Sequence, residues 1–197
     1  MKRDLNLNLL LLLVVLLAST TLHSSPILRS IWAQSSPKDN EELARLYQED
    51  QADRVPKDGP VDGKAIVARD RVRQARVKEL YQANQLQTGA DYYHAAMVLQ
   101  HGYVPEDYLL AHELCVVGIS KGEAKAKWLA AASEDRFLMA IGRPQRFATQ
   151  YRSDSPGTPM HLYQVNEGVT DELRRAMNAR SLAEAKAQEQ RMNPKKD

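Results

Sequence analysis

The sequence predicts a mainly α fold of antiparallel helical hairpins with a small β-hairpin near residues 145–166, and two observations support this. Apolar residues recur at helical spacing across residues 91–141, and only residues 102–104 and Gly122 separate the segments. Glycine commonly follows a helix end, and helices with such short links pack as antiparallel neighbours. Beyond residue 145 the apolar spacing changes to alternation around a turn-rich SDSPGT segment, which is typical of a β-hairpin.

The N-terminus predicts export. A short basic start precedes the unbroken apolar run Leu9–Ala18, and polar residues follow at once. The run is about half the roughly 20 residues of a spanning helix and matches the apolar region of a signal peptide. We expect residues 1–33 to be a signal peptide cleaved after Ala33, with an uncleaved membrane anchor as the alternative. The expected location is periplasmic or secreted, and any membrane contact would come from that anchor.

Charge and cysteine content narrow the function classes. Cleavage would remove three of the 27 basic and one of the 25 acidic residues, which leaves 24 of each. A neutral domain lacks the positive surface that binds nucleic acid, so no nucleic acid partner is expected. Cys115 is the only cysteine, so the chain has no internal disulfide and its core must hold by packing alone.

The mature chain is expected to be a single helical domain. The domain covers residues 41–190, after a polar linker at 34–40 and before a frayed tail at 191–197. Asp39 or Asn40 can cap its first helix. A second helix is expected at residues 68–84, and the core positions expected on it are Val72, Ala75, Leu80 and Tyr81.

The next three helices are expected at residues 91–101, 105–121 and 123–141. Their small residues and spaced glycines are similar to those of tetratricopeptide-type hairpins. Only about one and a half such units fit, so a short hairpin stack is expected instead of a long solenoid. Two further helices are expected near the C-terminus, one capped by Thr170 and one by a capping box of Ser181 and Glu184.

The first helix carries charge where its apolar stripe should continue. Leu43 and Leu46 begin the stripe, and Asp50 and Arg54 occupy its next positions. Either the end of the helix leaves the core, or it adds an acidic group to a polar pocket shared with other helices.

Several polar residues in the central helices are oddly placed for plain packing. Asp135 shares a helix face with apolar residues, where an unpaired carboxylate costs several kcal/mol, so we expect an Arg or His partner. His112 also lies on an apolar stripe, beside Cys115, whose apolar surroundings favour an inert thiol. We infer one polar cluster, composed of His94, His101, His112, Asp135, Arg136, Gln145 and Gln150.

Three kinds of chemistry could use this cluster. A carboxylate can orient a histidine for acid–base catalysis. Histidines and a carboxylate can bind a metal, but no HExxH-like spacing occurs, and neither a metal nor another cofactor is expected. A buried pair can also simply fix the register of two helices.

Five segments resemble an uncharacterised bacterial family, a domain of unknown function: EDQADR, DYYHAAMVLQHG, EDYLLAHEL, KWLAAASEDRFLMAIGRPQRFATQ and SLAEAKA. The family is marked by an Asp-Arg pair on a helix, followed by Gly-(Arg/Lys)-Pro-Gln-aromatic-x-Thr-Gln. The resemblance covers about residues 41–187, and Ala148 stands where the family has glycine. It implies no activity, and the residues that match its motif positions are Gln100, His101, His112, Asp135, Arg136, Gln145 and Gln150.

Two function classes remain open. The first is an exported helical-hairpin module that binds a peptide or an envelope protein, because such hairpins form concave surfaces. The alternative is a small hydrolase-like enzyme in which His112 and Asp135 are the catalytic acid–base pair. The candidate binding residues are His94, Gln100, His101, Arg136, Gln145 and Gln150.

Overall fold

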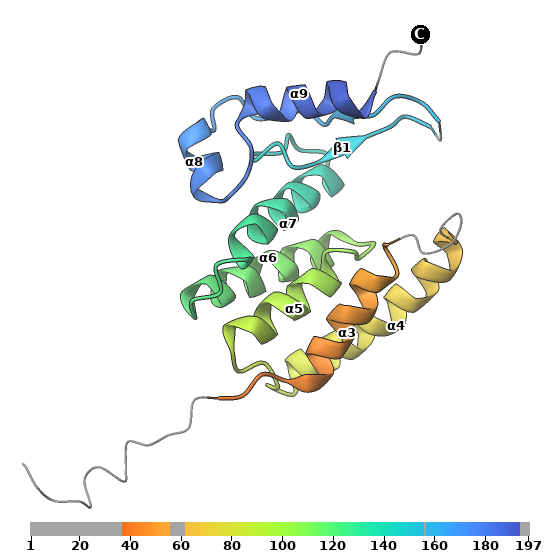
Figure 1. Cartoon of the computed structure of the whole chain (residues 1–197), viewed down its shortest axis with the longest axis vertical. Coiled ribbons are helices and arrows are strands. Elements are labelled where there is room, and N and C mark those ends of the chain that lie inside the picture. The colour runs from red at the N-terminus through yellow and green to blue at the C-terminus, as the bar shows by residue number, and fades with distance from the viewer. Residues whose placement is uncertain (1–36, 56–61, 156, 194–197) are drawn as a thin grey trace, which may run out of the picture. The chain divides into compact units, whose positions relative to one another are not determined.

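The computed structural model describes residues 37–55, 62–155 and 157–193, all within a unit that begins at Pro37. The predicted signal segment and the first part of the linker lie outside these residues. The mainly α prediction is confirmed, because the described chain forms seven helices and one two-stranded antiparallel sheet (Figure 1). None of these helices combines the length and the apolar character that crossing a membrane requires.

Five helices build the larger part of the domain. Consecutive helices contact one another, and the third of them also contacts the first and the last. Each contributes a residue that is at most 2% exposed to a shared apolar core: Leu43, Val77, Leu99, Leu114 and Leu129. The helices are α3 (Glu41–Ala52), α4 (Gly63–Gln82), α5 (Gly89–Leu99), α6 (Pro105–Ser120) and α7 (Ala126–Ala140).

The helix ends follow capping chemistry. The side chain of Asn40 accepts hydrogen bonds from the first turn of α3, as predicted. Thr88 and Asp91 form a capping box at α5. The second helix begins earlier than expected, because the side chain of Asp62 accepts hydrogen bonds from two backbone N–H groups of α4.

The face that α4 buries differs from the prediction. Val72 is 71% exposed and Tyr81 is 42% exposed, so neither is a core residue. Ala75 is exposed as well, and only Leu80 of the four expected core positions is buried. The helix instead turns a largely polar face inward, where ion pairs with the end of α3 satisfy the buried charges. That buried face consists of Asp70, Arg73, Gln74, Val77 and Leu80.

The C-terminal part confirms the predicted hairpin in a shorter form. Strand β1 (Tyr151–Arg152) pairs antiparallel with β2 (His161–Leu162), with Tyr151 opposite Leu162. A smaller apolar core joins this part to α7 through Ala131, Phe147 and Ala179.

Two short helices close the domain beyond the hairpin (Figure 1), α8 (Asp171–Ala176) and α9 (Leu182–Met192). The capping box of Ser181 and Glu184 is present at α9. This helix continues past the predicted domain end at residue 190, and Asn193 exchanges hydrogen bonds with the backbone of Met160.

Candidate functional site

The polar residues expected to form one cluster are divided between separate sets of contacts. Asp135 is fully buried on α7 and accepts hydrogen bonds from the loop that follows this helix. Its donors are the backbone N–H groups of Arg146 (2.7 Å), Phe147 (2.9 Å) and Thr149 (3.1 Å) and the Thr149 hydroxyl (2.7 Å). The expectation of an Arg or His partner is therefore wrong, because loop N–H groups satisfy the carboxylate.

Burial and hydrogen bonding act on Asp135 in opposite directions. Burial raises the pKa of the Asp135 carboxyl, and the hydrogen bonds from Phe147, Thr149 and Arg146 oppose that change. The carboxylate thus serves as the anchor around which the loop after α7 is wound.

Gln145 and Gln150 close the same loop. The Gln145 side chain donates to the carbonyl oxygens of Gln150 (2.9 Å) and Tyr163 (2.8 Å) and accepts from the Gln150 N–H (2.9 Å). Between them Ala148 adopts a φ of 57°, a left-handed conformation that glycine reaches at lower cost. The glycine that the resembled family has at this position would suit that backbone.

His112 does not pair with Asp135. Its Nδ1 lies 3.0 Å from the carbonyl oxygen of Ala130, one turn before the carboxylate on α7. The two proposed catalytic side chains share no hydrogen bond, since all the donors to Asp135 come from the loop. An acid–base dyad of His112 and Asp135 is therefore not formed in this geometry.

A different carboxylate–histidine pair is present, and the sequence did not predict it. His101 Nδ1 lies 3.2 Å from Oδ1 of Asp50, a fully buried residue near the end of α3. The Nε–H of Arg54 donates to His101 Nε2 (3.2 Å), so Nε2 holds a lone pair and the ring hydrogen is on Nδ1. Both ring nitrogens are thus engaged within the protein.

Arg54 binds two buried carboxylates at once. Its Nη1 lies 3.1 Å from Asp50 Oδ1 and donates to the Asp50 carbonyl oxygen (2.7 Å). Its Nη2 donates to Asp70 Oδ2 on α4 (2.9 Å). The second interpretation of the charged end of the first helix is therefore confirmed, since this end supplies acid to a shared polar region.

Two further arginines extend these contacts along α4. Arg73 Nη2 donates to Asp70 Oδ1 and to Asp53 Oδ2, both at 2.7 Å. Arg69 Nε also donates to Asp53 Oδ2 at 2.7 Å, and this hydrogen bond lowers the pKa of the Asp53 carboxyl. We refer to the connected set as the Arg54 network, which consists of Asp50, Asp53, Arg54, Arg69, Asp70, Arg73 and His101.

The Arg54 network is balanced in charge. It contains three carboxylates and three guanidinium groups. The α4 residues of the network do not appear among the core positions expected on that helix, because apolar periodicity selects only apolar residues. The spacing of Asp70 and Arg73, three residues apart on one helix face, is the signal that could have identified them.

The other expected binding residues on α5 and at its C-terminal end have local contacts. The His94 ring stacks on Tyr47 with centroids 4.6 Å apart, and its buried Nδ1 has no partner among the described residues. Burial lowers the pKa of His94. Gln100 Nε2 contacts the Met97 sulfur at 2.8 Å, and the buried Gln100 Oε1 likewise has no described partner.

Arg136 differs from the other inward-facing arginines because it has no salt bridge to a described carboxylate. Its buried Nε lacks a hydrogen-bond partner among the described residues, as do the Nε atoms of Arg73 and Arg174. Burial lowers the pKa of this guanidinium, the nearby Tyr108 opposes the change, and the positive charge of Arg54 adds to it. Arg136 directly follows Asp135, whose carboxylate accepts its hydrogen bonds from the loop after α7.

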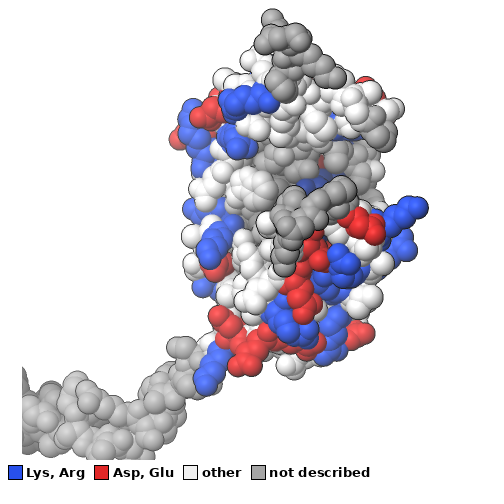
Figure 2. All heavy atoms as spheres, turned by 45° about the vertical axis from the view of Figure 1, so that its right-hand side comes forward, with Lys and Arg blue, Asp and Glu red and all other residues white. Residues whose placement is uncertain are grey.

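Metal binding has no candidate site in the described ranges, where no group of three His, Cys, Asp or Glu side chains could hold an ion. On the face shown in Figure 2, basic and acidic side chains are interspersed, in agreement with the balanced composition.

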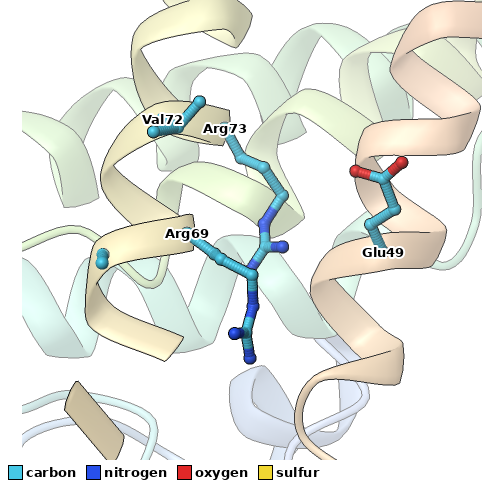
Figure 3. A pocket seen from close by; sticks show the side chains of 5 residues that line it. Glu49, Arg69, Val72 and Arg73 are labelled. Atoms are coloured by element: carbon cyan, nitrogen blue, oxygen red, sulfur yellow. The ribbon is translucent and has the colours of Figure 1, made fainter. Parts of the chain in front are cut away.

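An open groove lies between α3 and α4, with a volume of about 340 Å³. Figure 3 shows Arg69 and Arg73 extending from α4 toward α3, where Glu49 lies opposite, and Val72 near them on α4. Ala68 completes the lining. The groove therefore combines an apolar surface on α4 with charged groups of both signs.

No family model matches the chain, and no curated protein or solved structure is significantly similar to it. The resemblance to an uncharacterised bacterial family therefore stays a prediction, carried by the GRPQRFATQ segment and the Asp-Arg pairs.

Proposed function

We propose that this chain is an exported binding module that docks a short segment of a partner protein in the groove between α3 and α4. The observation that carries the proposal is Val72, which lies in the groove and is 71% exposed. Covering this side chain and the neighbouring Ala68 would remove apolar surface from water, which favours association.

The charges beside Val72 define the kind of segment. Arg69 uses its Nε for Asp53, its terminal nitrogens have no hydrogen bond to a described residue, and its side chain is 50% exposed. A guanidinium with free terminal nitrogens can bind a carboxylate through two parallel hydrogen bonds. The proposed ligand is therefore an apolar side chain followed closely by Asp, Glu or a C-terminal carboxylate.

The hydrolase alternative receives less support from the contacts. Asp135 is occupied by the loop after α7, and His112 is held at the Ala130 carbonyl. His101 has a carboxylate partner, but Arg54 occupies the Nε2 lone pair that would accept a substrate proton. These groups are engaged in holding the fold together.

Selection from a random short-peptide library on the purified domain tests the groove. We expect the enriched peptides to pair an apolar residue with a nearby carboxylate. Val72→Asp should weaken their binding at least about tenfold, through lost apolar contact and like-charge repulsion. Leu173→Asp, at an exposed position on α8, is the matched control and should bind as the native protein does. Peptides that bind Val72→Asp as well as the native domain would refute the groove as the docking site.

Export is part of the proposal and has its own test. Mass spectrometry of the protein isolated from a bacterial host that secretes it should give a mature chain that begins at Gln34. An intact Met1 in the membrane fraction would favour the anchor, and an intact chain in the cytoplasm would contradict export.

A further inference from the structure

We propose that Arg136 binds a small oxyanion, either a carboxylate or a phosphate group, at a half-buried position on α7 near Tyr108 and Arg54. This site is separate from the groove between α3 and α4 and does not depend on the function proposed for that groove.

The first step is a comparison of the inward-facing arginines. Five described arginines are buried or half-buried, and four of them have a carboxylate within 4.0 Å. The four are Arg54, Arg73, Arg146 and Arg174. Arg136 is the exception in the described part of the chain, with no salt bridge to any described carboxylate.

The second step is the charge of the neighbouring groups. The closest network, around Arg54, already balances three guanidinium groups with three carboxylates, so it has no spare negative charge for Arg136. Asp135, the preceding residue in the chain, accepts hydrogen bonds from the loop after α7 with both carboxylate oxygens. Neither the Arg54 network nor Asp135 therefore neutralises the positive charge of Arg136.

The third step is the state of the guanidinium itself. Its Nε is buried and without a described partner, as are those of Arg73 and Arg174. The terminal nitrogens of those two arginines donate to carboxylates, whereas the terminal nitrogens of Arg136 have no hydrogen bond to a described residue. A guanidinium that is partly removed from water without a partner is costly, and an apolar residue of similar size would fill the position at lower cost. An external anion would supply the missing partner.

The neighbours decide which group binds the ligand. The Tyr108 hydroxyl donates to the carbonyl oxygen of Gly102 at 2.6 Å, so its hydrogen is already used. Arg54 has each of its nitrogens directed at His101, Asp50 or Asp70. Arg136 is left as the donor. The planar fork of a guanidinium matches the two oxygens of a carboxylate or a phosphate group.

Thermal unfolding in two anions tests the proposal. The protein is titrated with sodium phosphate and, separately, sodium acetate, while sodium chloride holds the ionic strength constant. We expect the native Tm to rise saturably, by about 3 °C at a ligand concentration of roughly ten times Kd. A rise with phosphate alone would identify a phosphate ligand, and a rise with acetate would identify a carboxylate.

Arg136→Met should abolish the rise. Arg143→Met is the control, since Arg143 is exposed, lies just after the same helix and has no salt bridge to a described residue, so both variants lose one positive charge. The control should respond as the native protein does. No rise in the native protein, or an equal rise in Arg136→Met, would overturn the proposal.

A measurement on the native protein covers the case in which Arg136→Met does not fold. In nitrogen-15 NMR spectra, the Nε–H signal of Arg136 should shift with added phosphate or acetate and saturate at the concentration that saturates Tm. An unchanged signal throughout both titrations would contradict binding at this guanidinium.

Discussion

Asp135 illustrates how one side chain can organise a segment that has little regular structure. Three backbone N–H groups and one hydroxyl converge on its carboxylate, and these groups would otherwise be left without partners in a region that is mostly buried. A carboxylate with this many donors is a structural anchor.

We expect Asp135→Asn to lower the free energy of unfolding by about 2–3 kcal/mol. The amide can still accept from part of the loop, but its NH₂ group would face N–H donors and leave them unpaired. His112→Ala removes one hydrogen bond, to Ala130, and should cost about 1 kcal/mol. Urea unfolding at neutral pH measures both variants. Equal losses would show that the loop does not depend on the carboxylate in the way inferred.

We expect His94 to make the stability of the fold depend on pH. Since burial lowers the pKa of the folded imidazole, its stabilising contribution is fully present above the unfolded pKa of about 6.5 and is lost as pH falls through the lower, folded value. The charges of Asp39, Asp91 and Glu123 oppose this shift, and Lys125 adds to it.

His94→Phe should reduce this pH dependence, because a phenyl ring can keep the stack on Tyr47 without taking up a proton. Urea unfolding between about pH 7.5 and pH 5 should show a smaller loss of stability for the variant than for the native protein. An identical loss in both would assign the pH dependence to other groups.

At the scale of elements, α4 shows where sequence periodicity failed. The apolar pattern placed Val72 and Tyr81 inward, yet the helix buries Asp70 and Arg73. An ion pair neutralises two charges that each look solvent-facing when the sequence is read alone. The partners, Asp53 and Arg54, lie just beyond α3 and are 16 to 20 residues away. Periodicity cannot identify such a face, since it counts every charge as exposed.

Two substitutions in α4 test the orientation of this helix. Val72→Lys should change the free energy of unfolding by less than about 0.5 kcal/mol, since the side chain is mostly in water. Val77→Ala should lower it by roughly 2 kcal/mol, because Val77 is fully buried and its loss leaves a cavity. Urea denaturation measures both losses. If α4 instead buried the face that the sequence predicted, the loss would be larger for Val72→Lys than for Val77→Ala.

Local signals predicted the ends of elements more successfully. Asn40, Thr170 and the pair Ser181 and Glu184 act as caps in the predicted positions. Capping depends on residues within one turn, so neighbouring sequence contains the whole interaction. The partners of Asp135 lie 11 to 14 residues away in a loop, and their N–H groups carry no sequence signature.

At the scale of the whole molecule, the Arg54 network joins three consecutive helices through residues that are far apart in the chain. Arg54 lies just beyond α3, Asp70 belongs to α4 and His101 follows α5. The hairpins could be predicted because glycines mark the helix ends and small residues are typical of closely packed hairpins. The polar contacts between hairpins involve distant residues and became visible only in three dimensions.

Arg54→Met should lower the free energy of unfolding by about 3–5 kcal/mol, because it leaves Asp50 and Asp70 as buried carboxylates without this cation. The matched control is Arg45→Met on α3, where an exposed arginine pairs with Glu49 and a loss below about 1 kcal/mol is expected. Urea unfolding of both variants at neutral pH gives the comparison. Similar small losses would show that the network adds little to cohesion between the helices.

The lone thiol of Cys115 has a practical consequence. The side chain is fully buried, and burial raises its pKa well above the usual range, so the reactive thiolate does not form while the helices are closed. A thiol reagent can therefore label Cys115 only after α6 separates from the helices packed against it. The rate of labelling under native conditions therefore measures how often the helices open spontaneously. No engineered cysteine is needed for this measurement.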